Sequence, residues 1–372
     1  MRILITTTPG RGHWQPMLPL ANALVAAGHE LRWATAREAC GPLRERGFDV
    51  VEAGAHDLEM PAFPPEIAAL PPAERPERMF GVIFGPRRAA PMLRDLVPVV
   101  EDWRPRLLVC DQAELAGPIA AAQAGVLNVT HSFGRLLPEP RVRHGAEAVA
   151  GLWQAQGLEP RPYAGTYDHL YLDIYPPSLQ TPDIGHVGTR QLVRSVPHIA
   201  RETDAEPVVY ITFGTIFNKD LTLFAAAVEA ARELPVDVVV TLGPGNHAGA
   251  LGDQPANVTV AGYIPQEELL PRCAAVISHG GSGTFLGALA AGVPQLIVPL
   301  MADQYLNADA AVEGGVALAL RPEDATVAAL RDALTRVLDN TDLRAAAGAV
   351  ARELAAMPSA AEVADELARR FG

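Results

Sequence analysis

The chain has 372 residues, of which 49% are hydrophobic and 20% charged, so it has the composition of a globular protein long enough for two domains. Its 43 acidic and 30 basic side chains give a formal net charge of -13, which disfavours nucleic acid or an anionic membrane as the main partner. The sequence shows no secretory signal, and its three cysteines (Cys40, Cys110 and Cys273) stand far apart, so we expect a cytoplasmic protein. Because no apolar run approaches roughly 20 residues, we expect no integral membrane segment.

Strand-like and helix-like segments alternate from the N-terminus onward. A strand at residues 2–7 is followed by a helix at 16–27 and a second strand at 30–34. Further strands are predicted at residues 106–110, 126–130, 208–212, 237–242, 258–260, 275–278 and 295–298, with helical stretches between most of them. This order predicts an α/β protein with parallel sheets that are covered on both faces.

Two proline-rich stretches, residues 56–94 and 136–162, interrupt this alternation. We interpret them as loops and short helices over the ligand-binding edge, and an acceptor lid is favoured over an inert surface loop. The apolar residues of the first stretch favour a flat or greasy ligand; they are Met60, Phe63, Met79, Phe80, Val82, Ile83 and Phe84.

The segment from Tyr175 to Pro207 lacks clear periodicity, and a new β-α-β series begins at Val208. We therefore predict two domains, residues 1–200 and 201–356, and a separate final helix within residues 357–372 after the break at Met357-Pro358.

The loop after the first strand contains Gly10 and Gly12, which invites comparison with dinucleotide-binding sites. Gln15 occupies the place of the third glycine, and the second strand ends without the acidic residue that binds a ribose in many such sites. A hydride-transfer enzyme is therefore disfavoured.

The run His279-Gly280-Gly281-Ser282-Gly283-Thr284 lies between an apolar strand and a helix-like stretch. Small residues at such a junction let backbone N–H groups approach an anion, and the helix dipole adds attraction. Asp303 and Gln304 follow the next strand, so the ends of two neighbouring strands are predicted to carry a phosphate site and an acid-amide pair.

The tract from Val260 to Ala308 resembles the donor-binding signature of nucleotide-sugar glycosyltransferases of the GT-B type, and is most similar to the bacterial branch that decorates macrolides, enediynes and related antibiotics. The resemblance implies two Rossmann-like domains that face each other across a cleft. It implies an N-terminal domain that binds the acceptor, a C-terminal domain that binds the nucleotide sugar, and a final helix that packs back on the N-terminal domain.

The resemblance also implies roles for the residues of the donor site. The diphosphate would be bound by Thr215 and the glycine-rich run, the nucleotide base would lie near Tyr263 and Ile264, and sugar hydroxyls would bind the acid-amide pair. The complete set of donor-site candidates is Thr215, Tyr263, Ile264, His279, Gly281, Ser282, Gly283, Thr284, Asp303 and Gln304. Structural alternatives remain open: a turn hydroxyl for Thr215, a core position for Tyr263 and loop capping for Asp303 and Gln304.

His13 matches the family's general base, which takes the proton of the acceptor hydroxyl. A histidine near a helix N-terminus is held neutral by the dipole, and neutral imidazole is the form that a base needs. Asp111, directly after the strand at 106–110, matches the partner aspartate that orients the imidazole. Capping or turn roles are the structural alternatives for both residues.

The sequence thus predicts an inverting glycosyltransferase without a cofactor, which uses a nucleotide diphosphate sugar as co-substrate. Because no Asp-x-Asp motif occurs, we expect a metal-independent reaction. The donor is expected to be a dTDP-deoxysugar, and the acceptor to be a hydroxyl of an apolar or aromatic natural product. The alternatives are a UDP-sugar-dependent enzyme acting on phenols, a nucleotide-sugar epimerase, and a non-catalytic accessory protein; a homodimer is a candidate assembly.

Overall fold

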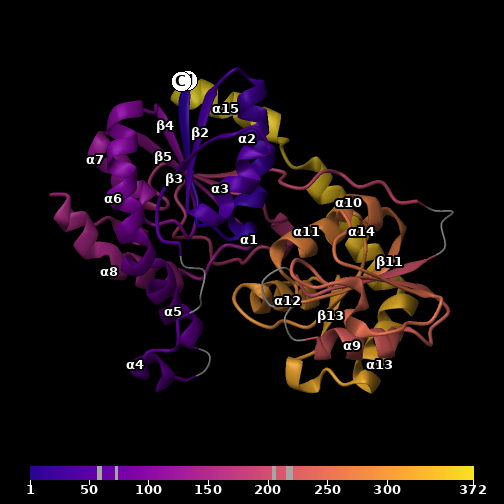
Figure 1. Cartoon of the computed structure of the whole chain (residues 1–372). Coiled ribbons are helices and arrows are strands. Elements are labelled where there is room, and N and C mark those ends of the chain that lie inside the picture. The colour runs from indigo at the N-terminus through magenta and orange to yellow at the C-terminus, as the bar shows by residue number, and fades with distance from the viewer. Residues whose placement is uncertain (57–60, 72–73, 203–206, 215–220) are drawn as a thin grey trace. The chain divides into compact units, whose positions relative to one another are not determined.

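The computed structural model describes residues 1–56, 61–71, 74–202, 207–214 and 221–372, and it divides into two compact units. Figure 1 shows that each unit is a β-sheet covered by helices. Unit 1 comprises Met1–Ile174, Thr181–Ser195 and Pro358–Gly372, and unit 2 comprises Tyr175–Gln180 and Val196–Met357. The chain passes from unit 1 into the long segment of unit 2 between Ser195 and Val196. The short segment Tyr175–Gln180 also belongs to unit 2, although the residues on both sides of it in the sequence belong to unit 1.

Unit 1 contains a seven-stranded sheet in the order β3-β2-β1-β4-β5-β6-β7, and every paired strand is parallel. Its strands are β1 (Arg2–Thr6), β2 (Glu30–Thr35), β3 (Asp49–Glu52), β4 (Leu107–Asp111), β5 (Leu127–His131), β6 (Leu170–Asp173) and β7 (Arg190–Leu192). The strand order reverses direction between β1 and β4, and ligands bind at this point in open parallel sheets.

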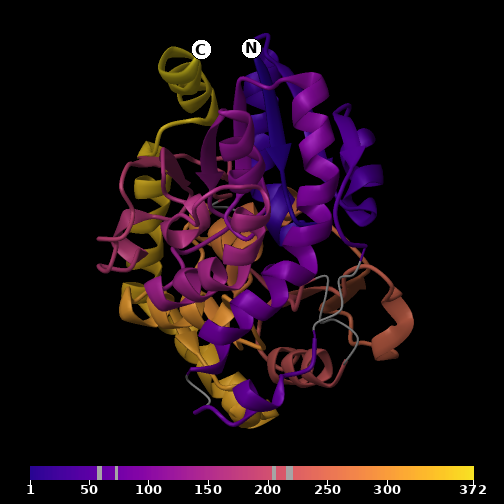
Figure 2. The ribbon, with the colours of Figure 1, turned by 90° about the vertical axis from the view of Figure 1, so that its left-hand side faces the viewer.

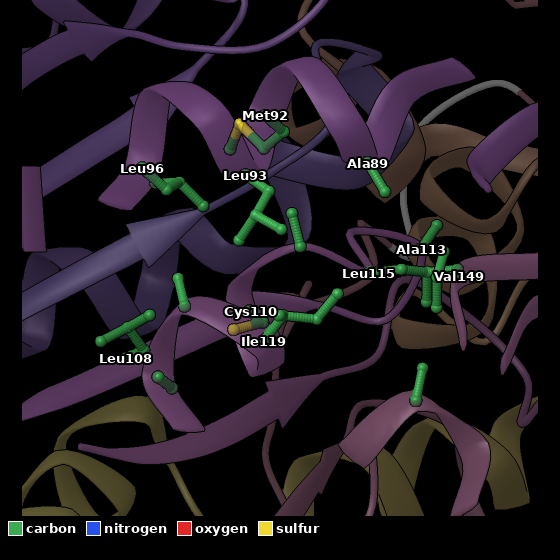
Figure 3. Packing of buried hydrophobic residues seen from close by; sticks show 14 of the residues in the cluster. Ala89, Met92, Leu93, Leu96, Leu108, Cys110, Ala113, Leu115, Ile119 and Val149 are labelled. Carbon is green, nitrogen blue, oxygen red and sulfur yellow. The ribbon is translucent and has the colours of Figure 1, made fainter. Parts of the chain in front are cut away.

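Helices cover both faces of this sheet. They are α1 (Arg11–Trp14), α2 (Leu18–Ala26), α3 (Arg37–Arg44), α4 (Pro65–Ala68), α5 (Arg75–Phe84), α6 (Pro86–Trp103), α7 (Gly117–Ala124), α8 (Glu139–Ala155) and α15 (Ala360–Phe371), with 3-10 turns η1 (Gln15–Met17) and η2 (Pro162–Gly165). Figure 3 shows Leu93 and Leu96 of α6 directed toward the side of Leu108 and Cys110 of β4, and these four side chains are buried. This packing fixes the strand whose last residue is the candidate partner of His13.

The final helix, α15, packs beside α2 within unit 1. Arg106, just before β4, donates a hydrogen bond from Nε to the carbonyl oxygen of Phe371 at 3.1 Å. Both chain ends therefore lie at the same end of unit 1 (Figure 1, Figure 2). A capping box at Ser359 and Glu362 starts the helix directly after the break that the sequence indicated.

Unit 2 contains a six-stranded parallel sheet in the order β10-β9-β8-β11-β12-β13. Its strands are β8 (Val208–Thr212), β9 (Asp237–Thr241), β10 (Val258–Ala261), β11 (Cys273–Ser278), β12 (Gln295–Ile297) and β13 (Ala317–Ala319). Its helices are α9 (Thr222–Ala231), α10 (Gln266–Leu269), α11 (Ser282–Ala290), α12 (Gln304–Glu313), α13 (Val327–Asp339) and α14 (Thr341–Ala356), with 3-10 turns η3 (Pro177–Leu179), η4 (Ala248–Leu251), η5 (Leu270–Arg272) and η6 (Pro322–Asp324). The two-sheet α/β architecture predicted from the sequence is confirmed.

The proline-rich stretches contain more helix than the sequence indicated. Residues 86–103 form the 18-residue α6, and residues 139–155 form the 17-residue α8. Pro91 and Pro98 are two turns apart on one side of α6 and avoid the buried stripe, so the helix keeps its core contacts around them. The strands β3, β6, β7 and β13, of three or four residues each, were also not predicted. None of the helices in the described ranges is both long and apolar enough to cross a membrane.

Candidate active site

His13 and Asp111 come together at the carboxyl end of the unit 1 sheet. His13 lies in α1, in the connection after β1, and Asp111 is the last residue of the neighbouring strand β4. The His13 Nδ1 atom is 3.0 Å from Asp111 Oδ2 and 3.3 Å from Oδ1. The Asp111 side chain is 1% exposed and that of His13 is 19% exposed, so the acid is covered and the imidazole can be reached.

The Asp111 carboxylate is fixed by other donors as well. Oδ2 accepts hydrogen bonds from the Thr8 backbone N–H at 3.4 Å and the Thr8 hydroxyl at 3.2 Å, and Oδ1 accepts from the Ala113 N–H at 3.2 Å. The hydrogen bond from Ala113 to Asp111 forms an Asx turn, which is the structural role that the sequence left open for Asp111. Asp111 makes this turn and the contact with His13 at the same time. These partners fix the buried carboxylate in a position where it can accept a hydrogen bond from the protonated Nδ1 of His13.

Two aromatic rings hold the imidazole plane of His13. The ring centroid of Phe133 lies 4.7 Å from that of His13, and Phe84 makes an edge contact at 5.6 Å. With Nδ1 directed at Asp111, Nε2 is the ring nitrogen left for a substrate proton. The sequence placed His13 before a helix, whereas it lies inside the four-residue α1. The Asp111 carboxylate orients its ring, as expected from the sequence.

In unit 2, the glycine-rich run forms the turn between β11 and α11. Gly280 has φ +77°, a left-handed conformation that favours glycine, and its carbonyl accepts a hydrogen bond from Asn307 Nδ2 at 2.9 Å. Gly281 is the N-cap of α11 and supplies no side-chain cap. The first backbone N–H groups of α11 therefore have no capping side chain and can bind an anion.

His279 occupies a narrow space between two glycines. A Cβ atom at Gly214 would lie 2.7 Å from His279 Cε1, and one at Gly281 would lie 2.5 Å from Nε2. Burial lowers the pKa of His279 to about 4, against the opposing effects of the Asp303 carboxylate and of a hydrogen bond with the Thr212 backbone. The imidazole is consequently neutral near pH 7 and can donate only one hydrogen bond.

A hydrogen-bond network connects α11 with the start of α12. The Ser282 hydroxyl donates to Asp303 Oδ2 at 2.8 Å, and Asn307 Nδ2 lies 3.2 Å from Ser282 Oγ. Tyr175, from the short segment that joins unit 2, donates from its hydroxyl to Asn307 Oδ1 at 3.0 Å. The network holds Asp303 beside the first turn of α11.

Gln304 and Thr284 have internal partners. Gln304 Oε1 accepts hydrogen bonds from the N–H groups of Leu300 at 2.8 Å and Met301 at 3.0 Å, so the loop-capping role holds for this oxygen. Within the described ranges its Nε2 has no partner, and this group can donate to a ligand. Thr284 Oγ1 accepts from Gln266 Nε2 at 2.8 Å, which leaves the Thr284 hydroxyl proton as a donor.

The remaining donor-site candidates differ in exposure. Tyr263 is 68% exposed, which excludes the core position that the sequence left open, and Ile264 packs against a buried cluster around β8 and β11. A Cβ atom at Gly283 would meet nothing within 4 Å, so the first turn of α11 borders open space. Thr215 lies outside the described residues.

The apolar residues expected to line an acceptor site are mostly internal. Met79 and Ile83 form a small cluster with Ile67, and Phe80 joins the main core of unit 1. They are buried because α5 is amphipathic and directs this stripe inward. Phe84 is the member that contacts His13, Phe63 is 53% exposed, and Met60 lies outside the described residues.

Comparison with known families assigns both units. Residues 22–185 match the N-terminal domain and residues 225–369 the C-terminal domain of the Erythromycin biosynthesis protein CIII-like family. The chain is 33% identical to L-demethylnoviosyl transferase of Streptomyces niveus over 99% of this chain and 98% of the relative. The chain is a natural-product glycosyltransferase of this family.

Solved structures resemble the glycosyltransferase over its whole length. The glycosyltransferase VinC in complex with DTDP has 29% identity and a TM-score of 0.83, with 99% of each chain covered. Spinosyn rhamnosyltransferase SpnG, complexed with spinosyn aglycone, has 27% identity and a TM-score of 0.83, and the match covers 100% of this chain and 99% of that one. These likenesses confirm the GT-B fold and favour sugar transfer over the epimerase and accessory interpretations.

Several residues of the glycosyltransferase site were missed by the sequence interpretation. Asn307 had a detectable signal, because it lies one helical turn after Asp303 and therefore on the same face of α12. Gly214 lies two residues after the end of β8, but its close contact with His279 depends on the pairing of β8 with β11. Tyr175 carried no signal, because its partner is 132 residues away.

Proposed function

We propose that the glycosyltransferase moves a deoxysugar from a dTDP carrier to a hydroxyl group of an apolar natural-product aglycone, with inversion and without a metal ion. The pair His13–Asp111, with 3.0 Å between Nδ1 and Oδ2, is the observation that carries this proposal. The relatives support both parts of the proposed donor. Noviose-type sugars and rhamnose are deoxysugars, and VinC was solved in complex with DTDP.

His13 acts as the general base in this proposal. Its Nδ1–H donates to Asp111, and Nε2 takes the proton from the acceptor hydroxyl as the oxygen attacks the anomeric carbon. The Asp111 carboxylate stabilises the imidazolium that forms. Because attack comes from the side opposite the leaving group, the new glycosidic bond has the inverted configuration.

The leaving diphosphate is stabilised by unit 2. As the bond between the anomeric carbon and the phosphate oxygen breaks, negative charge grows on the diphosphate. The N–H groups of Ser282, Gly283 and Thr284, the hydroxyl of Thr284 and the neutral imidazole of His279 are all donors fixed before reaction. These groups supply the charge stabilisation that a metal ion supplies in other sugar transferases, which supports the metal-independent reaction.

Asp303 and Gln304 bind the sugar in this proposal. The Asp303 carboxylate accepts hydrogen bonds and is positioned by Ser282, and Gln304 Nε2 donates. A pair with one acceptor and one donor group suits a polyol. A deoxysugar has fewer hydroxyl groups than glucose, so two such contacts are a large part of what it can form.

The test replaces His13 by Ala and Asp111 by Asn and measures transfer to an accepted aglycone from its dTDP-sugar. Loss of the base should lower kcat by roughly 100-fold or more. Asp111→Asn should also lower kcat, because the amide cannot stabilise the imidazolium. Both variants should bind thymidine diphosphate as the wild type does, because the proposed nucleotide site lies in unit 2.

Two further readouts address stereochemistry and metal use. The coupling constant of the anomeric proton, measured by NMR in donor and product, should report opposite configurations. Turnover should persist after treatment with EDTA. Unchanged turnover in His13→Ala would remove the proposed base, and retained configuration would exclude direct displacement.

A further inference from the structure

A small hollow opens in unit 1 beside the loop that leads to His13. Its walls come from residues 7–9 after β1, 53–55 after β3 and 113–115 after β4, together with Phe84 and the first half of α6. The hollow therefore lies at the carboxyl end of the sheet, on the same edge as His13 and Asp111. Its volume, about 20 Å³, gives room for one water-sized group.

Arg88 supplies the positive charge at this hollow. It lies in the first turn of α6, and its guanidinium carbon is 5.4 Å from the centroid of the Phe84 ring. The side chain is partly buried, and no carboxylate within the described ranges forms an ion pair with it. Burial, together with the neighbouring Arg87, lowers the pKa of Arg88.

Holding the Arg88 guanidinium at this position without a negatively charged partner costs free energy. A half-buried charge is normally paired, and a cation in the first turn of a helix also opposes the dipole. The first turn of α6 contains no acidic residue that could compensate. The contact with Phe84 offsets only part of this cost.

Glu114, the acidic side chain of the hollow, is engaged elsewhere. Its Oε2 accepts from the Thr6 hydroxyl at 2.6 Å and the Gly117 N–H at 2.9 Å, and Oε1 accepts from the Ala116 N–H at 2.7 Å. Burial raises the pKa of Glu114 to about 7. At neutral pH it is therefore about half ionised and opposes an incoming anion less than an ordinary carboxylate would.

Phe84 connects this charge with the proposed base. One ring contacts both the guanidinium of Arg88 and the imidazole of His13. We propose that Arg88 binds an anionic oxygen group of the acceptor, a carboxylate or an ionised phenol, in this hollow and so selects acceptors that carry one. This inference rests on the proposed function, because it assumes that the acceptor hydroxyl lies at His13.

The size of the hollow limits what enters it. The space holds one water-sized group, so only the oxygen end of the anionic group would enter, and the ring system of the acceptor would remain outside, next to Phe84. The planar guanidinium offers parallel N–H donors that match the two oxygens of a carboxylate. Lysine at this position would keep the charge but lose the paired geometry.

The test measures binding rather than turnover and uses the full chain saturated with thymidine diphosphate, so that the probes cannot occupy the nucleotide site. The probes are 6-hydroxy-2-naphthoate and its neutral methyl ester, titrated by fluorescence. The wild type should bind the acid roughly 10-fold or more tightly than the ester. In Arg88→Gln the acid should bind like the ester, and the ester affinity should not change.

Arg87→Gln is the matched control, because it removes the same charge from the exposed neighbouring position. It should keep the preference for the acid, and Arg88→Lys should keep part of it. Equal binding of acid and ester, no binding of the acid, or a preference that survives Arg88→Gln would overturn the inference. If His13→Ala retained full turnover while the Arg88-dependent preference held, the proposed base would fail and the anion site would stand.

Discussion

Two buried acidic residues three positions apart, one at the end of β4 and one in the loop after it, have different environments. Asp111 interacts with His13 and Thr8, whereas Glu114 accepts from one hydroxyl and two backbone N–H groups. The pKa of Glu114 is raised from 4.5 to about 7, mainly by burial and to a smaller extent by the nearby Asp111 carboxylate, against the opposing effect of the three hydrogen bonds. At the scale of single residues, the site thus combines Asp111, which orients the imidazole of His13, with Glu114, whose own carboxyl group has a raised pKa.

The raised pKa predicts a pH dependence of stability. The folded protein holds the Glu114 proton more tightly than the unfolded chain does, so this contribution is complete below about pH 4.5 and is lost as the pH rises toward 7. Relative to Glu114→Gln, the free energy of unfolding of the wild type should fall by up to about 3 kcal/mol over this range. Urea unfolding at several pH values measures the difference, and parallel curves for the two proteins would contradict it.

At the scale of elements, the turn from β11 into α11 determines how closely an anion can approach. Gly281 makes room for the His279 ring, while Gly283 borders open space. The two glycines therefore serve different purposes although they are two residues apart. The backbone of Gly281, at φ −62° and ψ 139°, would itself accept alanine, so the ring contact is the reason for glycine there.

Gly281→Ala should displace His279 and weaken the binding of thymidine diphosphate by roughly 10-fold, the value of one lost hydrogen bond to a charged group. Gly283→Ala is a control for folding alone, because its methyl group meets no protein atom and improves helix propensity by up to about 1 kcal/mol, although it enters the space proposed for the diphosphate. Calorimetric titration and melting curves distinguish the two effects. Wild-type affinity in Gly281→Ala would show that His279 does not contact the nucleotide.

At the scale of the whole molecule, the two candidate sites belong to separate units, each with its own sheet and core. The carboxyl ends of the strands carry the chemistry in both. The base pair lies at the reversal point of strand order in unit 1, and the glycine turn follows β11, next to the first strand of unit 2. In our proposal, the acceptor is assigned to unit 1 and the nucleotide sugar to unit 2.

Nucleotide preference can be measured on the whole protein by thermal shift. Thymidine diphosphate at about 100 times its Kd should stabilise the folded state by about 2.7 kcal/mol and raise the Tm by several degrees. Uridine diphosphate at the same concentration should have a smaller effect. A larger shift with the uridine nucleotide would redirect the donor assignment to UDP-sugars.

The sequence by itself determined the alternation of strands and helices, the turn before α11 and the family resemblance, because hydrophobic periodicity and glycine placement act between neighbours in the chain. It underestimated α6, since the prolines obscured the buried stripe of Ala89, Met92, Leu93, Leu96 and Val100. Short edge strands such as β7 and β13 had too few residues for a pattern.

The tertiary structure alone decided which side chains touch. His13 reaches Asp111 across 98 residues, Tyr175 reaches Asn307 across 132, and Gly214 accommodates His279 because β8 pairs with β11. These contacts depend on the order in which parallel strands assemble, which brings loops distant in sequence to one edge of a sheet. The absence of an ion-pair partner for Arg88 among the described residues belongs to the same class, because it depends on which segments the fold brings next to α6.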